Sequence, residues 1–233
     1  MMISLTPIAR LVSPYREKFG IPRQPGLSPV TAQVVLLPPF NQPASVEGLT
    51  GFSHIWLIFA FHAVEPRPGK HLSVRPPRLG GNERVGVFAS RATHRPNGLG
   101  LSLVELLSLE TQQGVRLQVR GADLLHDTPI FDIKPYLPQF EAIPQARAGF
   151  ASTPPKALPV IFLPEATACG INLYGEQWEN MAEWIRSCLQ YNPRPAYHND
   201  AQRVYGWRFA DLNIKWCTDG TQVWITQIEH SLA

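Results

Sequence analysis

Proline is distributed so unevenly in this chain that it limits which folds each part can adopt. Of the 23 prolines among 233 residues, 21 lie at or before Pro164, and only Pro193 and Pro195 follow. Proline inside a helix removes a hydrogen bond and clashes with the preceding turn, so such a chain does not form many long helices. Strands and turns are therefore expected in the first two thirds and a different structure in the last third. With 44% hydrophobic residues, the composition excludes collagen-like and disordered chains.

The net charge of +3 hides an asymmetry along the chain. Residues 1–100 carry 11 Lys and Arg against 4 Asp and Glu, whereas residues 101–233 carry 10 against 14. The excess is densest in one segment with a single acid, Glu83, and these cations: Arg67, Lys70, Arg75, Arg78, Arg84, Arg91 and Arg95. Guanidinium groups pair with phosphates and stack on bases, so the segment indicates an anionic partner such as nucleic acid, with a solvated loop as the alternative.

Cysteine usage and the N-terminus indicate a reducing compartment. Cys169, Cys188 and Cys217 lack the spacing of metal ligands, and their odd number argues against a disulfide framework. The N-terminus lacks the charged start and apolar core of a signal peptide, and the longest apolar run, residues 55–61, is too short to span a bilayer. We therefore expect a cytoplasmic protein with reduced, mostly buried thiols, no membrane association and no metal.

Several short segments before residue 140 have the composition of strands. Turn residues punctuate most of the gaps between them. The expected strands are Thr31–Leu37, Phe52–His62, Arg84–Ala89, Leu101–Leu109, Val115–Val119 and Ile130–Ile133. Many short strands without intervening helices favour a barrel or a sandwich. The chain lacks a G-x-G-x-x-G fingerprint and a P-loop, so a Rossmann-type nucleotide site is not expected.

The C-terminal third has the pattern of a small α+β domain. Residues Glu176–Gln190 repeat apolar side chains at intervals of three and four, which predicts a helix. The strands expected after it are Val204–Phe209, Leu212–Cys217 and Gln222–Ile228. Core packing is the main expectation for Trp216 and Trp224. The expected domains are thus a barrel at residues 1–140, a linker or surface loop at 141–164 and the α+β domain at 165–233.

Four segments contain Arg, Gly, Pro and Asn where the fold alone does not require them: residues 19–27, 61–62, 75–82 together with 86–102, and 127–138. The pair Gly80 and Gly81 permits close approach of the backbone to a ligand. His62 is either a ligand contact at the barrel mouth or a core histidine. Asp132 and Lys134 are two residues apart, so on a strand they face the same side, as part of a site or as a plain ion pair.

Six motifs stand in a fixed order: SPYREKF at 13–19, PRQPGL at 22–27, GFSHIW at 51–56, RPPRLGGN at 75–82, DIKPY at 132–136 and NPRPAY at 192–197. This series resembles the TsaA-like, or TrmO, family of tRNA methyltransferases. Several long motifs make the resemblance specific. One departure is Gly98, which stands where the family's Arg-Pro-Asn-Pro loop usually ends in proline. Glycine loosens that turn without removing a reactive group.

The resemblance implies a mainly β protein with a six-stranded β-barrel methyltransferase domain, distinct from the Rossmann type, that binds S-adenosylmethionine. It also implies a homodimer. Bacterial members of the family methylate N6 of N6-threonylcarbamoyladenosine next to the anticodon of threonine tRNA. The implied partner is therefore a threonine-type anticodon stem-loop.

Site residues are carried over from the family by position. The implied cofactor residues are Pro25, Gly26, Leu27, His62, Ala63, Thr93, Leu103, Thr128, Pro129 and Ile130. The implied contacts to the modified base and the RNA are Arg23, Arg75, Arg78, Arg91, Arg95, Arg194 and Tyr197. The candidates for catalysis are Asp132, Lys134, Tyr136 and Arg91. An Arg fork suits the threonyl carboxylate, and either Asp132 or a water would accept the N6 proton.

Two other functions stay open at the level of the sequence. A basic barrel also binds RNA without chemistry, in which case its affinity would be salt-dependent and indifferent to S-adenosylmethionine. A methyltransferase acting on a small molecule would not need the cationic segment. Neither alternative accounts for the ordered motifs as well as a tRNA methyltransferase does.

Overall fold

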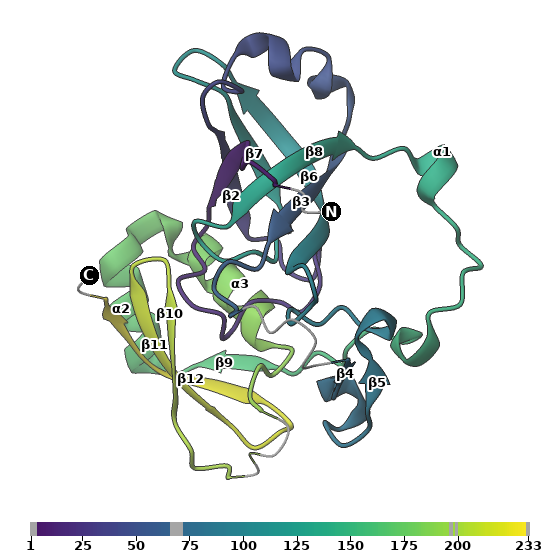
Figure 1. Cartoon of the computed structure of the whole chain (residues 1–233). Helices are drawn as coiled ribbons and strands as arrows, with labels where there is room; N and C mark the ends of the chain where they lie inside the picture. The colour runs from purple at the N-terminus through teal and green to yellow at the C-terminus, as the bar shows by residue number, and fades with distance from the viewer. Residues whose placement is uncertain (1–3, 66–71, 196–197, 199, 232–233) are drawn as a thin grey trace. The chain divides into compact units, whose positions relative to one another are not determined.

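A computed structural model describes residues 4–65, 72–195, 198 and 200–231 (Figure 1). It comprises two compact units. The first contains Met1–Val12, Thr31–Ala122 and Asp127–Pro154, and the second contains Ser13–Val30, Asp123–His126 and Pro155–Ala233. The expected barrel domain of residues 1–140 thus includes two segments that pack with the second unit. Over the described ranges, no helix combines the length and apolar character that a membrane crossing requires.

Six antiparallel strands close into a barrel in the first unit, which confirms the expected fold class (Figure 1). Around the barrel their order is β1, β2, β7, β6, β3, β8, with β8 paired back to β1. Their bounds are β1 Ala9–Val12, β2 Thr31–Leu36, β3 His54–Ala60, β6 Leu99–Glu110, β7 Arg116–Arg120 and β8 Pro129–Pro135. The expected strands at 31–37, 52–62, 101–109, 115–119 and 130–133 correspond to five of these six.

Alternating side chains fill the barrel, because successive residues of a strand point to opposite faces. Leu57 and Leu117 are fully buried inside it. Gly100 of β6 leaves no room for a side chain, because a Cβ there would overlap the ring of Phe59. The pairing of β3 with β8 shifts register at Phe131, which carries Asp132 and Lys134 to the outer face.

The expected strand Arg84–Ala89 is largely wrong. Only Val85–Gly86 forms a strand, β5, and it pairs with β4 (Ser73–Val74) as a two-residue ribbon. Residues Val87–Ala89 turn into a short 3-10 helix, η4. Other short helical turns of this unit are η1 Pro43–Val46, η2 Leu49–Gly51, η3 Pro77–Leu79, α1 Pro138–Glu141 and η5 Gly149–Ala151.

The second unit packs helices against a four-stranded sheet of order β10, β11, β12, β9. Its strands are β9 Val160–Phe162, β10 Tyr205–Phe209, β11 Leu212–Thr218 and β12 Val223–His230. Its helical segments are α2 Pro164–Tyr174, η6 Gly175–Gln177 and α3 Trp178–Leu189. The predicted helix 176–190 is confirmed as α3, whereas α2 and the parallel strand β9 were not anticipated.

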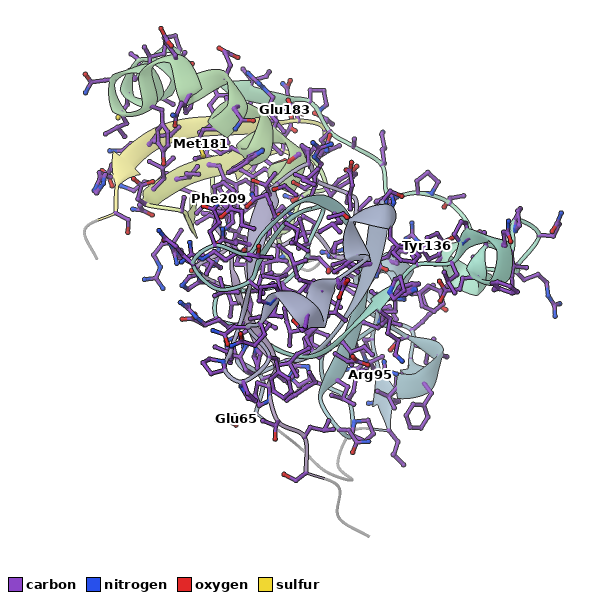
Figure 2. The ribbon with its side chains drawn as sticks, turned by 90° about the horizontal axis from the view of Figure 1, so that it is seen from above. Glu65, Arg95, Tyr136, Met181, Glu183 and Phe209 are labelled. Atoms are coloured by element: carbon purple, nitrogen blue, oxygen red, sulfur yellow. The ribbon has the colours of Figure 1, made fainter. Side chains whose placement is uncertain are left out.

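Aromatic side chains dominate the core of the second unit. Met181 of α3 and Phe209 of β10 both belong to this core (Figure 2). Trp216 is fully buried there, as expected, but Trp224 lies half-buried outside the core cluster. The reason is register: Ile225, the next residue, pairs with Trp216 and takes the inward position. Among the cysteines only Cys188 is buried, so the expectation of mostly buried thiols is wrong.

Candidate functional site

The barrel strands bring several predicted site residues to one end of the barrel. Ala60, the last residue of β3, pairs with Leu99 at the start of β6, and Phe59 pairs with Ile130 at the start of β8. The end of β3 and the beginnings of β6 and β8 therefore meet, and we call this the Thr128 end. The predicted residues at or next to this end are His62, Ala63, Arg91, Thr93, Arg95, Thr128, Pro129 and Ile130.

Backbone hydrogen bonds hold the Thr128 end together. Phe61 donates its N–H to the carbonyl of Gly98 at 2.8 Å, which joins the end of β3 to the loop before β6. Leu11 donates to the carbonyl of Thr128 at 3.0 Å. Thr128 is buried, Ile130 lies in the barrel interior, and His62, Ala63 and Thr93 are exposed. This end therefore combines a fixed backbone with exposed polar side chains.

Arg95 stiffens the loop that carries Arg91 and Thr93. Its Nη1 donates to the carbonyl of Ser90 at 2.7 Å and to that of Val87 at 3.3 Å. Its own backbone N–H donates to the carbonyl of Thr93 at 3.1 Å. One guanidinium nitrogen of this predicted substrate contact is thus engaged in holding the turn at η4.

A second group of predicted residues follows the outer face of β8. Lys134 Nζ lies 3.7 Å from Asp132 Oδ2, and Asp132 Oδ1 accepts the backbone N–H of Ile133 at 2.9 Å. The expected same-side placement of Asp132 and Lys134 is therefore confirmed. Lys134 pairs with Trp56, so this row of side chains leads away from the Thr128 end.

Tyr136 completes the row at the opposite end of the barrel, the Tyr136 end, beside the start of α1 (Figure 2). Its backbone N–H donates to the carbonyl of His54 at 3.0 Å. Its ring packs edge-on against the rings of His54 and Trp56, with centroids 6.4 and 6.0 Å apart. Trp56 in turn donates its indole N–H to Glu141. The ring of Tyr136 is therefore held on two sides.

Within one barrel Tyr136 lies far from the Thr128 end, whereas Asp132 pairs with Ile58, two residues before the end of β3. His54 and Ala60 bound the seven residues of β3, and six steps at about 3.4 Å each separate the two ends by roughly 20 Å. Leu103, a predicted cofactor residue, pairs with Trp56 in the middle of the same face. The sequence motifs mark residues of both ends without indicating this separation.

The remaining predicted residues belong to other segments of the two units. Arg75 and Arg78 are exposed around η3, and Arg78 donates to the carbonyl of Thr153. Arg23, Pro25, Gly26 and Leu27 belong to Ser13–Val30 of the second unit, a segment that leaves the barrel after Val12 and returns at Thr31.

The predicted contacts Arg23 and Arg194 both belong to the second unit. Arg194 donates to the carbonyl of Thr218 at 3.4 Å. Tyr197 lies outside the described residues. Arg23 is exposed, although desolvation lowers the pKa of its guanidinium, which stays charged at neutral pH.

Sequence reasoning missed Trp56 and Glu141, which support the candidate site at Tyr136. Trp56 was visible in the motif at residues 51–56, but only the pairing of β3 with β8 places it beside Tyr136. Glu141 carried no signal, because its role depends on the turn that α1 makes. In the part of the chain that the structure describes, His, Cys, Asp and Glu form no cluster able to hold a metal.

Two family models match consecutive parts of the chain. The family described as the tRNA-methyltransferase O N-terminal domain matches residues 10–142, and the TrmO C-terminal domain matches residues 155–231. The chain belongs to the TrmO family. Together the two matches include the barrel and most of the second unit, in the order that the family has.

Curated relatives and solved structures of the TrmO family match along nearly the whole chain. A Pseudomonas aeruginosa protein named "Putative S-adenosylmethionine-dependent methyltransferase RcsF" is 46% identical over 93% of this chain and 93% of its own length. The Escherichia coli K12 protein named tRNA (adenine(37)-N6)-methyltransferase is 42% identical over 88% of each chain. A crystal structure of TrmO from Pseudomonas aeruginosa superimposes with a TM-score of 0.81 and 38% identity, covering 98% of this chain and 99% of that one.

Proposed function

We propose that this chain transfers a methyl group from S-adenosylmethionine to N6 of adenosine 37 in tRNA. The substrate form is N6-threonylcarbamoyladenosine next to the anticodon of threonine tRNA. The observation that carries the proposal is the match of both TrmO domains, in order, on a closed six-stranded barrel. A binding module without chemistry does not explain relatives that are named as methyltransferases over the same length.

The Thr128 end fits S-adenosylmethionine in its chemistry. The cofactor has an adenine ring, a carboxylate, an ammonium group and a sulfonium, and it supplies an electrophilic methyl group when bound. The Thr128 end offers the half-buried ring of Phe61, the cation of Arg91 and the carboxylate of Asp127, which lies 2.9 Å from Arg10. The exposed residues His62, Ala63 and Thr93 would contact the cofactor. Thr128 and Pro129 would line the same site.

The work of the protein in this reaction is positioning and removal of a proton. Methyl transfer needs the N6 nitrogen in line with the methyl carbon, and a fixed site supplies that alignment. Asp132 is the proposed acceptor of the N6 proton, since its Oδ2 faces only Lys134 at 3.7 Å among the contacts described. Lys134, Tyr136 and Arg91 would hold the modified base, with Arg91 paired to the threonyl carboxylate.

A homodimer in the cytoplasm is also part of the proposal. The homodimer is supported by the separation of roughly 20 Å between the Thr128 end and the Tyr136 end along β3. In the proposed dimer a two-fold axis runs across the barrels. It would place the Thr128 end of one protomer beside the partner's Tyr136. One active site would then contain residues of both chains.

The activity is tested with S-adenosylmethionine carrying a labelled methyl group. The purified protein is incubated with threonine tRNA that either contains or lacks the threonylcarbamoyl group, and the nucleosides are analysed by mass spectrometry. Label is expected only in N6-threonylcarbamoyladenosine. Equal labelling of both tRNAs would contradict the substrate, and an absence of calorimetric S-adenosylmethionine binding would contradict the cofactor.

The shared site is tested by mixing two inactive variants, His62→Ala and Tyr136→Ala. If each site combines both ends from different protomers, half of the dimers contain one intact site. Activity then returns to about a quarter of the wild-type level. A mixture that stays inactive while heterodimers form would contradict a shared site.

A further inference from the structure

Two large exposed apolar side chains flank the β4–β5 ribbon, Leu72 directly before β4 and Phe88 in η4 after β5. The exposed fraction is 71% for Leu72 and 77% for Phe88. Val87, the residue before Phe88, donates its N–H to the carbonyl of Leu72 at 2.9 Å, so the two side chains branch from neighbouring points of the backbone. Exposed apolar groups that cluster in this way mark contact surfaces more often than isolated ones do.

The backbone under Phe88 is held rigidly on both sides. Ser90 donates its hydroxyl to the carbonyl of Val87 at 2.9 Å, and Arg95 Nη1 donates to the carbonyls of both residues. Arg95 lies beside the ribbon (Figure 2). The aromatic ring of Phe88 is therefore presented from a fixed turn, so binding through it costs little ordering of the loop.

The surroundings of this apolar pair are strongly cationic. Within residues 72–98 there are five arginines and one acid, Glu83, the arginines being Arg75, Arg78, Arg84, Arg91 and Arg95. The segment 142–154, which reaches η3 through the bond from Arg78 to Thr153, adds Arg147 and no acid. A second copy of this chain would meet the same positive charges face to face, which disfavours self-association through this patch.

An aromatic ring among guanidinium groups matches single-stranded RNA. Unpaired bases stack on aromatic side chains while arginines contact the neighbouring phosphates. We propose that Phe88, with Leu72 beside it, stacks on an unpaired base of the anticodon loop next to the methylated adenosine. This inference rests on the proposed function, since it names how the same substrate is gripped.

Binding of an unmodified anticodon stem-loop, followed by fluorescence anisotropy at several salt concentrations, tests the stacking. The variants are Phe88→Ala, Phe88→Trp and, as a matched control, Phe140→Ala, whose side chain is 80% exposed on α1. Loss of stacking is expected to weaken RNA binding of Phe88→Ala about tenfold or more. Phe88→Trp and Phe140→Ala are expected to bind as the wild type does.

The salt dependence separates stacking from charge. Phe88→Ala is expected to keep the wild-type slope of log affinity against log salt, because the ring contacts no phosphate, whereas Arg84→Ala is expected to lower that slope. Affinity for S-adenosylmethionine and elution volume on a sizing column are expected to stay unchanged in Phe88→Ala. A smaller species on the column would show that a second copy covers the patch and would overturn the proposal.

The outcome is independent of the activity assay. If Phe88→Ala binds the stem-loop as tightly as the wild type while the wild type methylates tRNA, only the stacking proposal is wrong. If the wild type fails to methylate tRNA but loses RNA affinity through Phe88→Ala, the stacking proposal stands and the proposed reaction is wrong.

Discussion

Trp56 donates its indole N–H to both carboxylate oxygens of Glu141, at 3.0 Å each. The same carboxylate accepts the backbone N–H of Leu137 at 2.9 Å. Glu141 therefore ties β3 to the residue that follows Tyr136, and with it fixes the end of β8. A side chain with no apparent role in the sequence thus orients a candidate substrate contact.

Replacing Glu141 with alanine is expected to slow methyl transfer with only a small loss of stability. The hydrogen bonds are partly exposed, so their loss should cost about 1 kcal/mol of unfolding free energy. The freed Tyr136 should lower kcat roughly fivefold to tenfold, a ΔΔG‡ of about 1–1.4 kcal/mol, with the affinity for S-adenosylmethionine unchanged. Urea unfolding and steady-state kinetics measure the two effects. Glu110→Ala, at the far end of β6, serves as the control, and equal losses of activity in both variants would contradict the orienting role.

Replacing Arg95 with alanine and replacing Arg91 with alanine are expected to reduce activity for different reasons. Arg95→Ala removes the bonds to the carbonyls of Val87 and Ser90, so proteases should cut residues 87–98 faster and activity should fall at least tenfold, about 1.4 kcal/mol. Arg91→Ala should lose as much activity with the loop still protected and the melting temperature retained. Arg116→Ala, on the outward face of β7, should behave as the wild type does. A protected loop in inactive Arg95→Ala would instead make Arg95 a direct substrate contact.

Replacing Gly170 of α2 with alanine is expected to destabilise the protein, although alanine usually stabilises a helix. Alanine is favoured over glycine in helices by about 1 kcal/mol, but a Cβ at this buried position would overlap the ring of Trp178. Gly170→Ala should therefore lower the unfolding free energy of the second unit by about 1–3 kcal/mol. Urea unfolding followed by tryptophan fluorescence measures it. Ala168→Gly, exposed on the same helix, is the matched change, with an expected loss of about 1 kcal/mol from propensity alone.

The stability of the second unit is expected to fall in alkali because of Cys188. Burial raises the pKa of this thiol from 9.0 to about 11, and hydrogen bonds from its neighbours only partly oppose the shift. A group with a raised pKa in the fold binds its proton more tightly there, so stability is full below pH 9 and is lost as the pH rises towards 11. The loss attributable to the thiol is about 2–3 kcal/mol.

Urea midpoints at pH 8 and pH 10.5 test this dependence. The difference between the two midpoints should shrink in Cys188→Ala, although burial also raises the pKa of Tyr15 and leaves part of the effect. Cys217→Ala is the comparison, since Cys217 is half-buried and desolvation together with the charge of Asp219 raises the pKa of its thiol. An unchanged pH dependence in Cys188→Ala would show that the thiol does not titrate with unfolding.

The barrel was predictable from the sequence where apolar and polar residues alternate along a strand, as in β7. Val115, Leu117 and Val119 are all buried, with Arg116 and Gln118 between them facing outward. Periodicity failed where structure depends on a distant partner. Strand β9 has three residues and pairs only through its parallel backbone contact with β12. Helix α2 leaves Ile171 and Leu173 exposed, so its apolar residues do not form the stripe that predicts a helix.

The site was predictable as a set of residue types but not as a geometry. The motifs place Arg91, Thr93 and Arg95 in one loop, and the structure keeps them there. Whether Tyr136 lies near His62 depends on which direction β8 takes beside β3, and a single residue of slip at Phe131 decides which face Asp132 occupies. The register of β8 is set by pairing in the closed barrel, so it cannot be predicted from a short segment of sequence.

The insertion of Ser13–Val30 into the second unit has a consequence for how the protein is made. Tyr15 is fully buried against Phe209, with ring centroids 5.6 Å apart. The ribosome adds almost two hundred residues after Tyr15 before it adds Phe209. A fragment beginning at residue 155 would lack Tyr15 and Val30 and would expose the apolar surface that they cover. The second unit therefore completes its core only when the last strands leave the ribosome, and the N-terminal segment has to remain unpaired until then.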